Sequence, residues 1–275
     1  PPFSYGLSKV PTTLQVKAPS GYDRYKLIII EEKKDEASLV SFLREKEYSS
    51  QAAILNTIED AYRVYKKINE NEDIKDKDKI YLLHGLMTPL HKRVIIETIR
   101  QALSNNEYPL YVISTQVIEA GVDVSFQHIA RALSVLPSIV QAAGRVNRHN
   151  EGTDKGVISV FPFYRAGETN TRSYIYPKNL QKITDQILSV KTSWVETELT
   201  VLVQKYYKEM FSQNTYEGIL ASIKDAYQGD WEQVSKLEPL GKDYLRLPLF
   251  VPWDPDEAEK EFLSEKLKKF TFLQE

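Results

Sequence analysis

The chain has 275 residues and a formal net charge of −2, so no overall positive field draws in nucleic acid and any polyanion site must be a local patch. It contains no cysteine, which excludes disulfides, thiolate metal sites and cysteine nucleophiles. Hydrophobic residues make up 42% and charged residues 27%, as in globular proteins. No apolar run approaches the ~18 residues of a membrane span and no leader is recognisable, so we expect a cytoplasmic protein, or part of one, with no membrane partner.

Residues 1–24 contain four prolines and little periodicity, which is typical of an arm or linker. From Tyr25 onward, short apolar runs alternate with amphipathic stretches. We expect strands at residues 26–30, 52–55, 80–83, 110–114, 129–133 and 157–161. We expect helices at residues 36–47, 56–68, 89–103 and 138–148, and a solvated loop at 69–79. This alternation indicates an α/β domain over residues 25–165, with a parallel sheet and helices on both faces.

The pattern changes after residue 165, where the apolar runs typical of strands stop. Helical periodicity follows at residues 180–190, 197–211, 216–226 and 257–270. We therefore place a boundary near 165–175 and expect a mainly helical C-terminal linker or accessory region over 166–275.

The segment at the end of the strand expected at 110–114 has an unusual composition, with hydroxyl, glycine and acidic residues close together. Ser114 and Thr115 end that strand, and Gly121 and Asp123 follow a short apolar pair. Hydroxyls and backbone N–H groups at a strand end can hold phosphate oxygens, and a carboxylate can accept from a ribose or orient an arginine. On this segment alone a structural interpretation is favoured, in which Thr115 caps a helix and Asp123 caps the next element.

The second unusual segment is residues 141–148, Gln-Ala-Ala-Gly-Arg-Val-Asn-Arg. If it is helical, Gln141, Arg145 and Arg148 share one face, and Gly144 allows another backbone to approach closely. Two guanidinium groups without an adjacent acid repel one another unless an anion lies between them, and the planar fork of arginine suits phosphate. The alternative is a solvated basic helix end favoured by the helix dipole.

Taken together, the two segments resemble motifs V and VI of superfamily-two helicases, and more closely the helicase part of the type I CRISPR-associated helicase-nuclease. Residues 114–123 read Ser-Thr-Gln-Val-Ile-Glu-Ala-Gly-Val-Asp, and 141–148 follow in the expected order. Residues 53–57 resemble motif IV of that family, and residues 83–89 its next block. The resemblance covers about residues 25–165 and implies a RecA-like fold.

The resemblance also implies roles at the nucleotide. Arg148 matches the arginine finger that reaches the γ-phosphate of ATP on a neighbouring RecA-like domain, and Arg145 matches its companion. Gln141 matches the motif VI residue that faces the nucleotide. Gly121, Asp123 and Gly144 complete the nucleotide-facing set. ATP and Mg²⁺ are the implied cofactors, held mainly by the other domain, and no metal ligand is assigned in this chain.

Further positions match the family's contacts with single-stranded DNA. Thr115 matches the hydroxyl that touches the strand backbone, with Ser114 beside it. Asn56 and Thr57 lie where motif IV makes similar contacts. Arg93 is a further candidate. One position departs from many superfamily-two helicases, which have arginine where this chain has Ala142, although an alanine variant fits the CRISPR family.

Two parts of a complete motor have no counterpart in this sequence. There is no Gly-x-x-x-x-Gly-Lys-Ser/Thr phosphate loop, because Asp243 follows the only Gly-Lys pair, and there is no His-Asp dipeptide of the nuclease site. We therefore expect the second RecA-like domain of a motor whose first domain and HD nuclease lie elsewhere in the same or a separate chain. The family then implies single-stranded DNA and a guide-RNA surveillance complex as partners.

Two other functions remain open at this point. An RNA helicase of the same superfamily has similar motifs V and VI. A non-catalytic RecA-like module that docks a protein partner is consistent with the missing phosphate loop, although such a module has no use for the pair Arg145 and Arg148.

Overall fold

The structure is a computed structural model. It describes residues 23–46, 48–70, 79–148, 155–165 and 169–213, together with positions 227, 229 and 232. Most of the predicted arm and of the loop at 69–79, and the helices predicted at 216–226 and 257–270, lie outside the described residues.

The strands have the bounds β1 (Tyr25–Ile29), β2 (Ser50–Ile54), β3 (Lys79–Leu83), β4 (Leu110–Ser114), β5 (His128–Ala132), β6 (Gly156–Phe161), β7 (Tyr164–Arg165), β8 (Thr169–Asn170) and β9 (Ser193–Val195). The helices have the bounds α1 (Glu36–Glu45), α2 (Ile58–Asn69), α3 (Pro89–Ser104), α4 (Leu136–Ala143), α5 (Arg172–Ile175), α6 (Lys178–Leu188) and α7 (Glu196–Gln213). A single 3₁₀ turn, η1 (Gln116–Ile118), follows β4.

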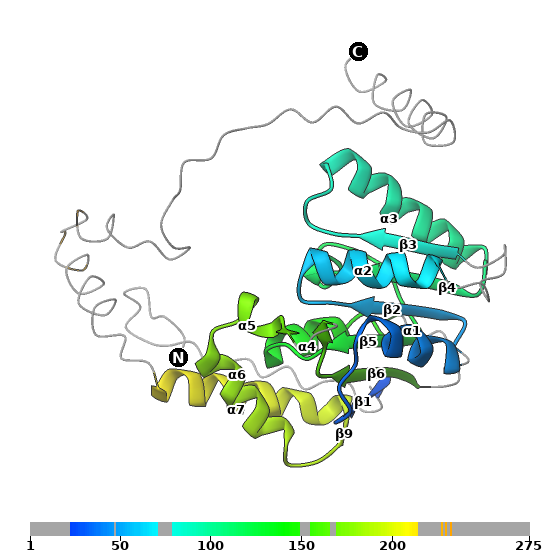
Figure 1. Cartoon of the computed structure of the whole chain (residues 1–275). Helices are drawn as coiled ribbons and strands as arrows, with labels where there is room; N and C mark the ends of the chain where they lie inside the picture. Colours follow the sequence, from blue (N-terminus) through cyan, green and yellow to red (C-terminus); the bar gives the residue numbers. More distant parts are fainter. Residues whose placement is uncertain are drawn as a thin grey trace.

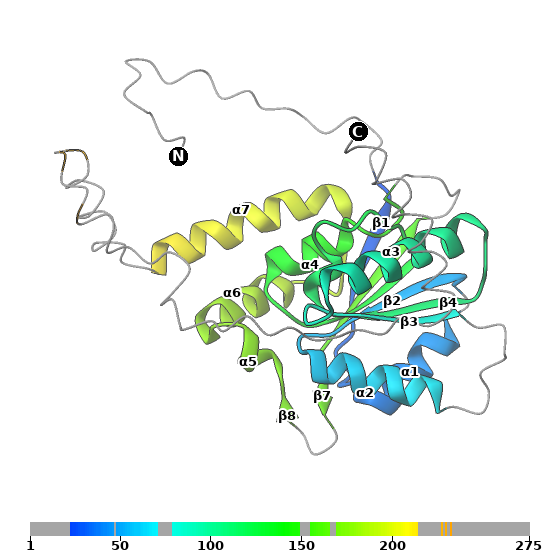
Figure 2. The same ribbon diagram turned by 90° about the horizontal axis from the view of Figure 1, so that it is seen from above.

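Seven of these strands form one sheet in the order β3-β4-β2-β5-β6-β1-β9. All neighbours from β3 to β1 are parallel, and β9 runs antiparallel to β1. Helices cover both faces: α1 and α2 lie on one side, and α3, α4, α6 and α7 on the other (Figures 1 and 2). The predicted α/β, RecA-like parallel sheet is therefore confirmed.

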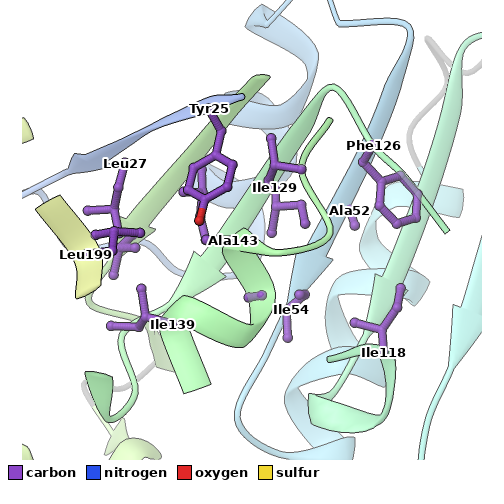
Figure 3. Packing of buried hydrophobic residues seen from close by; sticks show 14 of the residues in the cluster. Tyr25, Leu27, Ala52, Ile54, Ile118, Phe126, Ile129, Ile139, Ala143 and Leu199 are labelled. Atoms are coloured by element: carbon purple, nitrogen blue, oxygen red, sulfur yellow. The ribbon is translucent and has the colours of Figure 1, made fainter. Parts of the chain in front are cut away.

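Side chains of each central strand alternate between two hydrophobic cores, as the twofold periodicity of a strand requires. Ala52 and Ile54 of β2 belong to the larger core, beneath α3, α4, α6 and α7, whereas Ala53 belongs to the core beneath α1 and α2. Figure 3 shows the larger core, in which Leu27 of β1, Ile139 of α4 and Leu199 of α7 are labelled. None of the helices in the described ranges combines the length and apolar content of a membrane span.

Local sequence explains where the first helices begin. The Asp35 carboxylate accepts from the Ser38 backbone N–H, and the Ser38 hydroxyl accepts from the Asp35 N–H, which is a complete capping box for α1. Thr57 caps α2, and Thr88 with Pro89 begins α3. These caps fix the chain direction at the carboxyl ends of β1, β2 and β3.

Two expectations about the later part of the chain are wrong. Strands do not stop after residue 165, because β9 pairs with β1 and β8 pairs with β7. Side chains of α6, β9 and α7 join the same core as the sheet, among them Ile187, Trp194 and Leu202. The expected boundary at 165–175 therefore falls inside packing that continues into α7, as far as Tyr206 and Met210. The sequence pattern did not reveal β9 because this strand has only three residues.

The helix predicted at 138–148 is also shorter than expected. It is α4, Leu136–Ala143, with Gly144 as its C-cap residue. Beyond it the backbone turns and Val146 forms a β-bridge with Phe126. The Phe126 N–H donates to the Arg145 carbonyl at 3.0 Å, so the helix ends because its next backbone groups bond to the loop before β5.

A buried histidine makes this sheet sensitive to acid. His128 of β5 is fully buried, with its ring nitrogens 2.9 Å from Gln51 Oε1 and 3.0 Å from Ser159 Oγ. Burial lowers the pKa of His128 to about 3, and the positive charge of Lys46 acts in the same direction. Between pH 6.5 and 3 the unfolded chain therefore binds a proton that the folded chain does not.

We predict that the free energy of unfolding falls by about 2 kcal/mol between pH 7.5 and pH 5 through His128 alone. Urea denaturation at the two pH values measures this loss. His128→Gln should lower the stability at pH 7.5 and remove most of that acid-dependent loss, whereas His91→Gln should keep it. An equal loss in the native chain and in His128→Gln would contradict the assignment.

Candidate functional site

The carboxyl ends of β2, β3 and β4 surround a pocket of about 530 Å³. Ligands gather at this edge in open parallel sheets. Three residues predicted to contact single-stranded DNA line this pocket: Asn56 and Thr57, which follow β2, and Thr115, which follows β4. The complete lining consists of Asn56, Thr57, Ile58, Gly85, Thr115, Gln116, Val117 and Ile175.

Two hydroxyl groups in this pocket have different surroundings. Thr57 Oγ1 accepts from the Asp60 N–H and from the Arg165 guanidinium, each at 3.1 Å. Thr115 precedes η1, but its side chain makes no capping bond, so the alternative role as a helix cap is wrong. Thr115 lines the pocket although it is only 4% exposed, and Thr57 keeps its O–H hydrogen for a further acceptor.

Two other predicted strand contacts are used inside the domain. Ser114 is fully buried and its hydroxyl donates to the Leu83 carbonyl at 2.8 Å, so it does not reach the pocket. The Asn56 amide donates to the Leu133 carbonyl at 3.0 Å, and its oxygen accepts from Arg131 at 2.9 Å. The side chain of Asn56 lines the pocket but is anchored by these internal bonds, because burial requires both polar ends to be paired.

Arg93 is exposed on α3 and is not among the residues that line the pocket. Its neighbour Lys92 reaches the rim instead, with Nζ 3.1 Å from the Gly85 carbonyl. The spacing in the sequence could have indicated this position of Lys92, because Lys92 lies one helical turn after Thr88, the residue that caps α3.

Three of the predicted nucleotide-facing residues, Asp123, Arg145 and Arg148, lie in two loops near the amino ends of the strands. Arg148 Nη1 lies 2.9 Å from Asp123 Oδ1, and their side chains are 36% and 56% exposed. Arg145 donates through Nε and Nη2 to the Glu119 carbonyl at 3.2 and 2.7 Å. A hollow of about 450 Å³ adjoins Asp123. An ion pair this exposed contributes at most about 1 kcal/mol, so an anion can displace Asp123 from Arg148.

This arrangement corrects two expectations. Gln141 lies exposed on α4, whereas Arg145 and Arg148 lie on the loop beyond it, so the three side chains do not share a helical face. Nor do the arginines lack an adjacent acid, since Asp123 comes from a distant part of the sequence. Partial burial and the nearby Arg148 charge both lower the pKa of Arg145, as expected for guanidinium groups held close together.

The two predicted glycines differ in what they require. Gly121 has φ +75°, a left-handed conformation that favours glycine, and a Cβ added there would meet no atom within 4 Å. Gly144 has an ordinary helical φ of −63°, and an added Cβ would lie 3.3 Å from the Gln141 carbonyl. The close approach of another backbone, expected at Gly144, is therefore not present.

Sequence reasoning missed a positioning residue in the predicted arm. Arg24 donates through Nε to Glu196 Oε1 at 3.0 Å and through Nη1 to the Arg148 carbonyl at 3.0 Å. The carbonyl of Arg24 accepts from Asn147 Nδ2 at 3.2 Å. Arg24 thus joins the start of β1, the start of α7 and residues 145–148, which are called the arginine loop below. No sequence pattern links residues this far apart.

A buried arginine was missed as well. Arg131 in β5 is fully buried and lies 3.0 Å from Glu119 Oε1. An arginine within an otherwise apolar strand is a usable signal, because a charge there needs a partner. No group of three histidine or acidic side chains in the described ranges is arranged to hold a metal ion.

The parallel sheet, with hydroxyl groups at its carboxyl edge and residues 145–148 packed on the loop before β5, has the architecture of a RecA-like domain. Residues 47–151 match the family model described as the C-terminal part of the CRISPR-associated nuclease/helicase Cas3. Over these residues the chain is therefore similar to the C-terminal helicase part of Cas3.

Individual relatives agree with this assignment. The chain is 44% identical over 89 residues to the CRISPR-associated nuclease/helicase Cas3 of Haloferax volcanii, which is 32% of this chain and 9% of that protein. The crystal structure of T. fusca Cas3 with ATP superposes with a TM-score of 0.59 at 18% identity, over 79% of this chain and 27% of that chain. A chain of a CRISPR RNA-guided surveillance complex before nicking superposes with a TM-score of 0.51 at 17% identity, over 75% of this chain and 28% of that chain. The matched region is thus a small part of the curated relatives.

We predict that Arg24→Ala lowers the free energy of unfolding by about 1–2 kcal/mol, because it leaves the largely buried Glu196 carboxylate without its guanidinium partner. Hydrogen exchange of the amides at 145–148 should accelerate in the same variant, since Arg24 also holds the Arg148 carbonyl. Lys191→Ala, which breaks the more exposed pair with Glu198, is the matched control and should cost less than about 0.5 kcal/mol. Equal effects of the two substitutions would refute the anchoring role of Arg24.

Proposed function

We propose that this chain is the second motor domain of an ATP-dependent single-stranded DNA translocase that acts in CRISPR interference. The observation that carries the proposal is the paired loop arrangement, in which Arg145 and Arg148 are held beside Asp123 while Thr57 and Thr115 line the opposite edge of the same sheet. One domain thus presents anion-binding groups at two separate places.

At the nucleotide, Arg148 acts as the arginine finger and Arg145 as its companion. ATP with Mg²⁺, bound by a facing RecA-like domain, supplies the phosphoryl group whose hydrolysis drives the motor. Arg148 exchanges the Asp123 carboxylate for the γ-phosphate, and Asp123 then becomes available to a ribose hydroxyl. The Arg145 bond to the Glu119 carbonyl keeps this loop next to the facing RecA-like domain throughout the exchange.

At the pocket beyond β2, β3 and β4, here called the strand pocket, Thr57 and Thr115 donate hydroxyl hydrogens to the phosphate backbone of DNA, and Lys92 supplies a positive charge at the rim. Backbone contacts of this kind carry no base code, so sequence preference is weak and salt dependence is strong. Asn56 keeps the pocket in shape through its internal bonds.

The wider assignment follows from the family. An HD nuclease and a guide-RNA surveillance complex are the further partners that we propose, supported by the Cas3 relatives and by the similar fold of a chain in a surveillance complex. The surveillance complex selects the target, and this domain moves the displaced strand.

We predict that the isolated chain neither hydrolyses ATP, because its sequence contains no phosphate loop, nor cleaves DNA, because it contains no His-Asp dipeptide. Phosphate release from the purified chain should stay at the buffer background with or without single-stranded DNA. Addition of the domain that carries the phosphate loop should restore turnover. DNA-stimulated turnover by the chain alone would overturn this prediction.

In the assembled motor, we predict that Arg148→Ala lowers kcat for ATP hydrolysis by about 10³-fold or more, within the range known for arginine fingers. The dissociation constant for single-stranded DNA should change by less than about threefold, because Arg148 lies away from the strand pocket. Arg63→Ala, which removes an exposed charge on α2, is the control and should leave both values unchanged.

Steady-state phosphate release and fluorescence anisotropy measure the two quantities. Equal losses of hydrolysis and DNA binding in Arg148→Ala would show that the finger is misassigned. Tighter binding of single-stranded RNA than of DNA would favour an RNA helicase instead.

A further inference from the structure

The connection from β4 to β5 runs from one edge of the sheet to the other. It starts at Thr115 in the strand pocket, at the carboxyl edge, and reaches Phe126 at the amino edge, beside the arginine loop. Its only helical part is the three-residue turn η1. A crossover with so few backbone bonds of its own depends on side-chain contacts for its position.

Arg131 supplies the first of these contacts. Its Nη1 donates to Asn56 Oδ1 at 2.9 Å and to the carbonyls of Ile54 and Ala132 at 3.1 and 2.9 Å. Its Nε lies 3.0 Å from Glu119 Oε1. Arg131 therefore ties the strand pocket, through Asn56, to the middle of the crossover.

Glu119 continues the connection through two different groups. Its carboxylate pairs with Arg131 and accepts from Ser138 Oγ at 2.8 Å. Its backbone carbonyl accepts both bonds from Arg145. Burial raises the pKa of the Glu119 carboxyl while the Arg131 charge opposes that rise. The same residue thus contacts the strand side through its side chain and the nucleotide side through its backbone.

Tyr176, which follows α5, adds a second link to the pocket. Its hydroxyl lies 3.0 Å from Gln116 Nε2 and 3.2 Å from Arg131 Nη2. Gln116 lines the pocket and also donates to the Asn56 carbonyl at 3.1 Å. Asn56 thus contacts the buried Arg131 guanidinium directly, and Gln116 reaches it through the Tyr176 hydroxyl.

We propose that the buried Arg131–Glu119 pair, with Tyr176, couples strand binding to nucleotide binding by holding the crossover in register with both sites. The proposal rests on the proposed function. A buried ion pair is costly to desolvate and is often replaceable by apolar side chains without loss of stability, so stability alone does not account for it. Displacement of Asn56 or Gln116 by a strand moves Arg131, and Glu119 passes that displacement to Arg145.

The direct test is thermodynamic coupling, because two linked sites change one another's affinity by the same factor. The dissociation constant of a fluorescent single-stranded oligodeoxynucleotide is measured on the assembled motor, with and without a non-hydrolysable ATP analogue. The ratio of the two constants is the coupling factor, which typically lies between about 5 and 150 in coupled proteins.

We expect Glu119→Gln to bring this coupling factor to about 2 or less, while DNA affinity without nucleotide stays within about threefold of the native value. Tyr176→Phe removes one hydroxyl from a half-buried ring, so it tests the same link if Glu119→Gln does not fold. It should reduce the coupling factor to a smaller extent. Asp185→Asn, which removes the partner of the buried Arg172, is the matched control and should leave the factor unchanged.

A native coupling factor in both Glu119→Gln and Tyr176→Phe would overturn the proposal, as would an equal loss in Asp185→Asn. Failure of the proposed function looks different, because the native motor would then bind neither the oligodeoxynucleotide nor the ATP analogue.

Discussion

The position of the arginine loop depends on a short backbone pairing between Phe126 and Val146. The Phe126 N–H donates to the Arg145 carbonyl at 3.0 Å, and the Asn147 N–H donates to the Phe126 carbonyl at 2.9 Å. Both paired side chains are buried, and Figure 3 shows Phe126 within the larger core. The pairing ends α4 and turns the chain toward the loop before β5. Arg148 consequently lies just beyond this pairing rather than along a helix.

The proposed function requires that the backbone of each site be held in place while some side-chain contacts can be exchanged for a ligand. The backbone pairing and the Arg24 anchor provide firmness at the arginine loop, and the Asn56 bonds provide it at the strand pocket. The exposed pair of Arg148 and Asp123 is the weak element, because solvent screens it and a phosphate can replace the carboxylate. The arrangement thus combines a fixed backbone with an exchangeable side-chain partner.

Sequence patterns predicted the parallel sheet well, because the strands are short, rich in apolar residues and alternate with helices, and each of the first three helices has its own cap. Thr57 and Thr115, which the sequence singled out, both line the pocket at the carboxyl ends of β2 and β4, whereas Ser114 turns inward and its hydroxyl donates to the Leu83 carbonyl. Helical spacing was a poor guide beyond Gly144, since the end of α4 is decided by Phe126, which lies far back in the sequence. Contacts of that range have no local pattern to reveal them.

The most direct test of the account is a structure of the assembled motor with a non-hydrolysable ATP analogue and single-stranded DNA. The account predicts that the Arg148 guanidinium leaves Asp123 and lies within hydrogen-bond distance, about 3 Å, of a γ-phosphate oxygen. The strand backbone should contact the hydroxyl of Thr115 in the same structure. An Arg148 that keeps its pair with Asp123 while the cleft is closed on nucleotide would contradict the account.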